Sequence, residues 1–291
     1  MIMKNIYPLP RTLLSALLIC TLSAPLYAAI TPEEQVIPRI VQLSKIPTTE
    51  SVNEVIALAQ EGSTNKMRLQ FVMTALIQIG ASTAGDAYVK GILDDANAAD
   101  MSVKGGLAYL AQRPEPWMVA YAEKFLADSY DGETRCMAAK LAGALGITTS
   151  VETIKQIIST SAYGDVRSQA AYGLAQLMPV TDFVTAIDAT DMRSWDKTLA
   201  KQLNVFVQAD AATKESDISK KLKRSEFIFP LAAMRYMLQT NNIELLKKYV
   251  VQGDATSLTI PNRAHQLFVR MLGYQITGNI DNVVISQIPA L

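Results

Sequence analysis

The sequence predicts an all-α protein, a right-handed α-solenoid of about seven antiparallel helix pairs. Three observations support this class: a short motif recurs at near-constant spacing, each copy has the apolar spacing of an amphipathic helix, and another helical segment separates successive copies. A single helix pair cannot bury both apolar faces by itself. Stacked pairs form a continuous core, and we therefore expect a solenoid.

The recurring motif is clearest in two segments 32 residues apart, which share Arg, two Ala and Leu at equivalent positions. The first runs from Arg135 to Leu145 and the second from Arg167 to Leu177. A third copy, Lys104 to Ala111, lies 31 residues before the first, and a weaker fourth begins at Arg68, 36 residues earlier still. Each copy has apolar residues three, four and seven positions apart, which is typical of one face of a helix.

Further helices are predicted between and after these copies. Gly80 and Gly146 are expected to end helices, and Thr149 and Glu152 have the spacing of a capping box. The clear repeats occupy residues 66–178 and weaker ones residues 180–278, within one solenoid domain of residues 29–278 that is followed by a cap or tail at 279–291. The additional helices are expected at residues 116–128, 151–159, 194–208, 214–222, 229–239, 242–251 and 261–276.

The segment Asp165-Val-Arg167-x-x-Ala170-Ala171-x-x-Leu174-x-x-Leu177 resembles the second-helix signature of HEAT repeats, including the PBS-lyase type. The segment from Asp131 to Ala142 is similar, with one extra residue between the acid and Arg135. The resemblance extends from about residue 66 to residue 177 and implies a fold of stacked helix pairs. It implies no activity, because similar repeats serve mostly as protein-binding scaffolds.

Residues 1–28 have the pattern of a secretory signal peptide. Lys4 and Arg11 give a positive start, residues 13–22 form an apolar run, and small residues follow up to Ala28. The run is too short to span a bilayer as a helix, and no later stretch reaches the required length. We therefore expect an exported protein, cleaved after Ala28, that is periplasmic and makes no stable membrane insertion.

The charge balance bounds the class of partner. Cleavage would remove two bases and no acid, which leaves 25 basic and 27 acidic residues. A nucleic-acid-binding protein usually has a basic excess, so the sequence predicts no nucleic-acid partner. Cys136 would be the one remaining cysteine, so the core has to hold the exported chain together without disulfides.

No residue set in the sequence predicts catalysis, a metal site or a cofactor. His265 is the only histidine, which excludes a zinc site built on several histidines. Cys136 follows Arg135 at a helix start, where a thiol can become reactive, but Ser168 and Gly105 occupy the equivalent positions and indicate a packing site. We expect a non-enzymatic protein.

One row of bases carries the binding hypothesis: Arg68, Lys104, Arg135 and Arg167 stand at equivalent positions of successive repeats. Stacked repeats would align them along one face, where they could bind an acidic peptide or an anionic polymer. In the alternative, each base pairs with a turn acid such as Asp131. Tyr109 and Tyr172 are also equivalent, and they are either exposed contact residues or buried edges of the core.

The sequence thus favours a periplasmic scaffold or adaptor that binds another protein through its helical-repeat surface. Two alternatives remain open. One is a binder of an anionic envelope polymer such as peptidoglycan, which would bring the protein into contact with the cell wall. The other is an accessory subunit of an envelope enzyme.

Overall fold

A computed structural model describes residues 33–46, 48–61, 65–80, 82–160, 164–222, 224–226 and 228–240. This part consists of 13 α-helices and two short 3-10 helices, and it contains no strand. The predicted all-α class is confirmed. The predicted signal peptide, the helices expected at 242–251 and 261–276, and the expected cap or tail at 279–291 lie outside the described residues.

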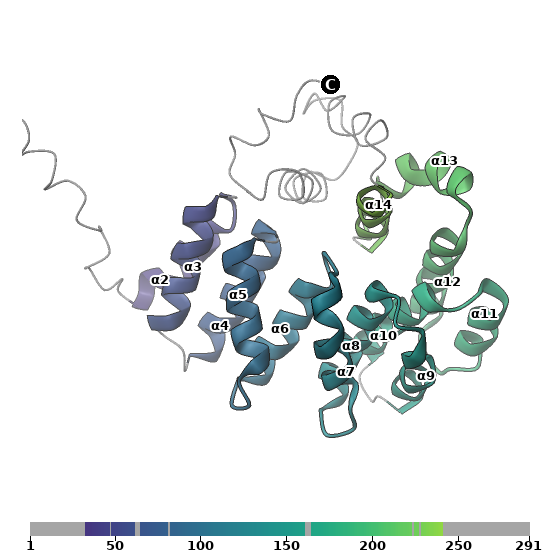
Figure 1. Ribbon diagram of the computed structural model, residues 1–291, viewed down its shortest axis with the longest axis horizontal. Helices are drawn as coiled ribbons and strands as arrows, with labels where there is room; N and C mark the ends of the chain where they lie inside the picture. Colours follow the sequence, from purple (N-terminus) through teal and green to yellow (C-terminus); the bar gives the residue numbers. More distant parts are fainter. Residues whose placement is uncertain are drawn as a thin grey trace, which may run out of the picture.

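The helices follow one another along an arc (Figure 1). Their bounds are α2 Glu33–Leu43, α3 Thr49–Glu61, α4 Lys66–Ile79, α5 Thr83–Asp94, α6 Asp100–Leu110, η1 Pro116–Met118, α7 Val119–Leu126, α8 Gly132–Leu145, η2 Thr148–Ser150, α9 Val151–Thr160, α10 Gly164–Leu177, α11 Val180–Asp188, α12 Ser194–Gln208, α13 Ala211–Leu222 and α14 Ile228–Gln239. Within the described ranges, no helix combines the length and the apolar character that a membrane span requires.

The four motif copies form a continuous succession of packed helices. They lie in α4, α6, α8 and α10, and each of these helices packs against the next one. The intervening helices α5, α7 and α9 each pack against the motif helix that follows them. This contact pattern buries the apolar positions of each motif between neighbouring helices, as the repeat spacing predicts.

Local capping signals set several helix ends. The Asn65 side chain accepts a hydrogen bond from the Arg68 amide at the start of α4, and Asp131 accepts from the amides of residues 133 and 134 at the start of α8. Gly146 ends α8 with φ of 74°, in the left-handed region. The expected capping box before α9 is replaced by the 3-10 turn η2, and η1 likewise forms the start of the helix expected at 116–128.

The tightest packing in the arc is between α8 and α10. A Cβ built on Gly173 would lie 2.1 Å from the Ala139 carbonyl oxygen, and one built on Gly143 would lie 2.2 Å from the Gly173 carbonyl oxygen. The backbones of the two helices therefore touch directly. Ala138, Ala139, Ala170 and Ala171 surround the contact and are fully buried.

Helix α14 lies on the inner side of the arc (Figure 1), and it packs against α13 and α12. Its Arg235 donates from Nε to the Gln112 carbonyl oxygen, 123 residues away, at 3.3 Å. The same guanidinium donates from Nη1 to Gln176 Oε1 at 3.3 Å. These bonds connect the last described helix to the end of α6 and to α10.

Candidate functional site

The three arginines of the predicted basic row share one structural role. Each donates from its guanidinium to a backbone carbonyl near the end of the helix that precedes its own. The bonds are Arg68 Nη1 to Leu58 O at 3.1 Å, Arg135 Nε to Leu126 O at 3.1 Å, and Arg167 Nη1 to Ile158 O at 3.4 Å. Carbonyls at a helix end lack an intrahelical donor and carry the negative end of the dipole, so a cation there stabilises the helix.

Carboxylates supply the remaining partners of the row. Lys104 Nζ lies 2.6 Å from Glu133 Oε2 and 3.3 Å from Asp131 Oδ1, across to the next motif helix. Arg135 pairs with Asp128 at 2.6 Å. Asp131 was among the acids expected from the sequence, whereas Asp128 was not.

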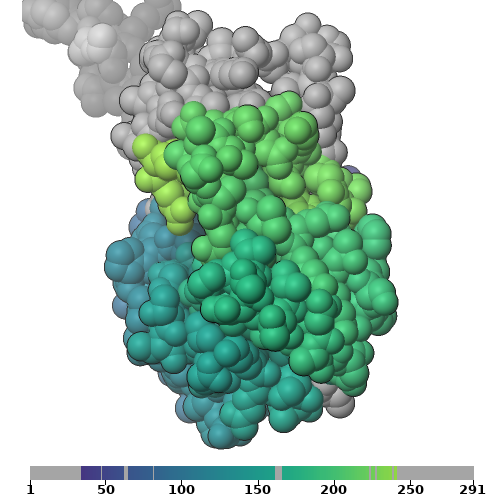
Figure 2. Space-filling view, turned by 90° about the vertical axis from the view of Figure 1, so that its right-hand side faces the viewer, coloured from purple at the N-terminus to yellow at the C-terminus, as the bar shows by residue number. Residues whose placement is uncertain are grey.

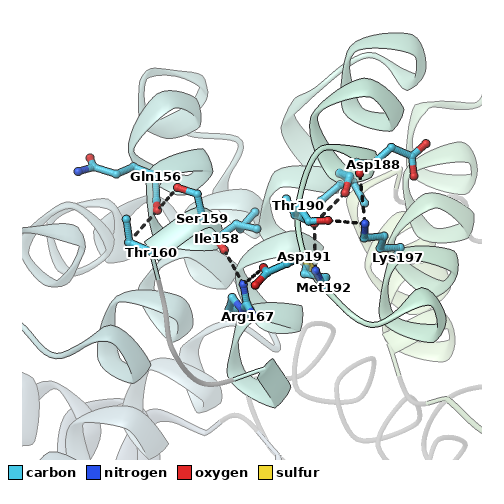
Figure 3. Close-up of polar contacts among 11 residues, drawn as sticks. Gln156, Ile158, Ser159, Thr160, Arg167, Asp188, Thr190, Asp191, Met192 and Lys197 are labelled. Atoms are coloured by element: carbon cyan, nitrogen blue, oxygen red, sulfur yellow. Dashed lines mark hydrogen bonds and ion pairs between the residues drawn. The ribbon is translucent and has the colours of Figure 1, made fainter.

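Figure 3 shows the arrangement around Arg167. Its guanidinium lies between the carbonyl of Ile158, at the end of α9, and the carboxylate of Asp191, in the loop after α11. The hydrogen bond from Arg167 holds the pKa of the Asp191 carboxyl below its ordinary value. Lys197 closes the same loop by donating to the carbonyls of Asp188 and Thr190.

The predicted row of bases therefore faces the joints between helices. Arg68 and Arg167 are only 4% and 9% exposed. Lys104 and Arg135 have side chains that are 17% and 13% exposed. This placement corresponds to the alternative in which the bases have partners within the chain.

The two equivalent tyrosines are buried. Tyr109 Oη accepts from the Ser82 amide at 3.0 Å and donates to Asp86 Oδ1 at 3.0 Å, which ties α6 to the start of α5. Gly85 leaves room for the ring, because a Cβ there would lie 2.6 Å from Tyr109 Oη. Burial raises the pKa of both Tyr109 and Tyr172. These positions are edges of the core, and neither ring is available as an exposed contact.

Cys136 is fully buried in α8. This matches the packing position inferred from the small residues at equivalent sites. Among the described residues, no three His, Cys, Asp or Glu side chains gather where they could hold a metal ion.

A surface that the sequence did not indicate lies on α12. Trp195 is 60% exposed and Val205 is 53% exposed. Thr198 and Gln202 between them are also exposed. These four residues are spaced by three, four and three positions, so they share one face of the helix. We call this uncharged face the α12 stripe.

Helix α12 is held in this orientation by its opposite face. Leu199, Leu203 and the fully buried Asn204 pack inward. Asn204 Nδ2 donates at 2.8 Å to the carbonyl oxygens of both Ala175 and Met178 at the end of α10. These two bonds and the buried leucines hold α12 with the stripe exposed.

The guanidinium of Arg224, which has hydrogen-bond partners within the chain, borders the α12 stripe. Arg224 donates from Nη1 to Gln202 Oε1 at 3.2 Å and from Nε to Glu226 Oε2 at 2.7 Å. The hydrogen bond from Arg224 lowers the pKa of the Glu226 carboxyl. The guanidinium also stacks 4.5 Å from the ring centre of Phe229. An uncharged centre with a polar rim is the usual anatomy of a protein interface.

Helix α12 belongs to the end of the molecule seen in Figure 2, where the green segment from α11 to α13 faces the viewer. The sequence signal of the stripe is visible in retrospect. In residues 194–208, Trp195 falls at the border between the apolar face of Leu199 and Leu203 and the face that carries Thr198 and Gln202. A tryptophan at the edge of the apolar face of an amphipathic helix is compatible with a contact residue.

The chain was compared with protein-family models, curated proteins and solved structures, and none of them matches. A functional assignment therefore has to come from the residues and their geometry.

Proposed function

We propose that this protein is a HEAT-like α-solenoid of the periplasm that binds another protein through the α12 stripe and has no catalytic role. The motif copies in α4, α6, α8 and α10, each packed on the next, support the solenoid. The leader pattern of residues 1–28 supports export. Edman sequencing that begins at Ala29 is the expected result for the mature protein.

The single observation that carries the binding proposal is the exposure of Trp195, at 60%, on an uncharged helix face that ends in Val205. An exposed indole and an exposed valine lose unfavourable contact with water when a partner covers them. Tryptophan is also among the residues that dominate binding energy at protein interfaces. The cost of fixing its side chain is low, because it has only two rotatable bonds.

A protein partner is favoured over an anionic polymer by charge. Binding to a polyanion depends on available cations. Arg135 and Arg167 are engaged with carbonyls and carboxylates of the chain itself, and the α12 stripe contains no charged residue. An apolar or aromatic protein surface is the complementary partner for such a face.

The experiment is a quantitative affinity capture from the envelope of the source cell, read by mass spectrometry. The bait is the tagged chain with either Trp195→Ala or Val205→Ser, compared with the unmodified chain. Loss of the indole is expected to weaken partner recovery by at least roughly tenfold. The matched control is Trp117→Ala, because Trp117 is 37% exposed but lies at η1, away from α12.

Equal recovery of every protein by all four baits would remove the stripe from the binding surface. Retention on purified cell wall that disappears at high salt would instead support the polymer-binding alternative.

A further inference from the structure

A cavity of about 530 Å³ lies between α3 and α5, far along the chain from the α12 stripe. Leu69 of α4 and Ser102 of α6 complete its lining, together with the loop that joins α5 to α6. Its volume falls in the range of small-molecule sites. We call it the α3–α5 cavity.

The wall has an apolar part and a polar part of similar extent. Ala59, Leu69, Tyr88 and Ile92 present aliphatic and aromatic surface to the cavity. Gly91 widens it, because a Cβ built there would meet no atom within 4 Å. An apolar wall of this kind suits the body of a small organic molecule.

Two polar residues line the cavity. Ser102 is 3% exposed, and its Oγ is buried without a hydrogen-bond partner in the described part of the chain. At the rim, Asp95 Oδ1 accepts from the Asn97 amide at 2.9 Å, and no bond to Oδ2 is found among the described residues.

The charge of the lining selects the ligand. Asp95 is the one ionised side chain among the described lining residues. Lys124 lines the adjoining cavity of about 110 Å³, but its ammonium is bonded to the Leu93 carbonyl at 2.6 Å. A carboxylate at the rim favours a cation and disfavours an anion.

We propose that the α3–α5 cavity binds a small organic cation whose apolar body lies against the wall and whose ammonium pairs with Asp95. This site is separate from the protein-binding surface on α12, and either can fail without the other.

The test uses three probes of similar shape and different charge: phenethylamine, 2-phenylethanol and 3-phenylpropanoate. Binding to the full chain is titrated by protein-observed NMR. Phenethylamine is expected to bind about fivefold more tightly than the alcohol, and the acid most weakly. Asp95→Asn, a change at an exposed residue, is expected to reduce the preference for the amine to less than about twofold while the alcohol binds as before.

Filling the cavity gives the second measurement. Gly91→Leu places a side chain into the open space and is expected to abolish binding of all probes. Gly91→Ala is the matched control and is expected to retain it, with unchanged circular dichroism in both. The proposal is overturned if phenethylamine does not bind at millimolar concentration, if the acid binds as well as the amine, or if Gly91→Leu leaves binding intact.

Discussion

Individual residues decide how closely the repeats approach one another. The backbones of α8 and α10 touch at Gly143 and Gly173, which no larger residue could replace without moving a helix. Both glycines lie within helices and have no positive φ. Glycine is therefore required at these positions by the close approach of the neighbouring helix. The open position of Gly91 in α5 is the contrasting case, since nothing lies within 4 Å of a Cβ built there.

Gly173→Ala is therefore expected to lower the free energy of unfolding by about 2 kcal/mol or more, because the methyl group would overlap the Ala139 carbonyl. Gly91→Ala is expected to be neutral or to stabilise by up to about 1 kcal/mol, because alanine restricts the unfolded chain. Urea denaturation of both variants measures the difference. Equal effects of the two substitutions would contradict the close backbone contact.

Lys140 is a second residue whose environment has a measurable effect on the free energy of unfolding. It donates to Gln169 Oε1 at 2.8 Å, and no carboxylate bonds to it among the described residues. Burial, with a smaller contribution from nearby Arg235, lowers the pKa of Lys140 from its ordinary value of 10.5 to about 8. Between these pH values the unfolded chain binds more protons at this residue than the folded chain does.

The free energy of unfolding is therefore expected to rise by roughly 1 to 3 kcal/mol between pH 8 and pH 10.5. Below pH 8 both states are protonated and the destabilisation is fully present. Lys140→Met should remove this rise and stabilise the protein at pH 7, while exposed Lys90→Met should do neither. Chemical denaturation across this pH range is the measurement, and parallel curves for the unmodified chain and Lys140→Met would rule out the effect.

At the scale of the elements, helix ends are joined by side chains of later helices. Arg135 reaches the Leu126 carbonyl at the end of α7, and Asn204 reaches two carbonyls at the end of α10. The same device in three of the four motif copies explains why an arginine recurs there. The residue fixes the angle between consecutive helices and is a structural part of the motif.

Arg135→Met is accordingly expected to cost about 1 to 3 kcal/mol in the free energy of unfolding, because a buried carbonyl loses a charged donor. Partner recovery by the folded variant is expected to stay unchanged, since the α12 stripe is intact. Lys155→Met serves as control, because it removes only the pair with the 83% exposed Glu152 and should cost less than about 0.5 kcal/mol. A stable Arg135→Met variant that no longer recovers the partner would return this arginine to the binding surface.

The helices themselves follow from local sequence. The motif spacing predicted α4, α6, α8 and α10, and residues 194–208 were predicted with the bounds that α12 has. The hydrogen-bond partners of the predicted bases could not be predicted from the sequence. Spacing shows which residues share a helix face, but a long side chain such as that of Arg167 can turn into the joint between helices and bond to a carbonyl. Every residue has a backbone carbonyl, so the sequence does not show which carbonyl accepts the bond.

At the scale of the whole molecule, α14 connects distant parts of the chain on the inner side of the arc through a buried arginine. Arg235 bonds to Gln112 and Gln176, and burial lowers its pKa to about 10. The contact spans 123 residues, and the helical period of residues 229–239 could not indicate where that helix would lie. The exposed α12 stripe takes no part in this contact and is the surface that we assign to a partner.

The central claim is that a protein partner docks on the α12 stripe, and site-specific photocross-linking tests it most directly. A photoreactive phenylalanine derivative replaces Thr198, between Trp195 and Val205, and a control chain carries it at exposed Glu152 of α9. Irradiation of the source cell's envelope is expected to give one discrete protein adduct from position 198 and none of that mass from position 152. The same adducts from both positions, or no adduct from position 198, would contradict the claim.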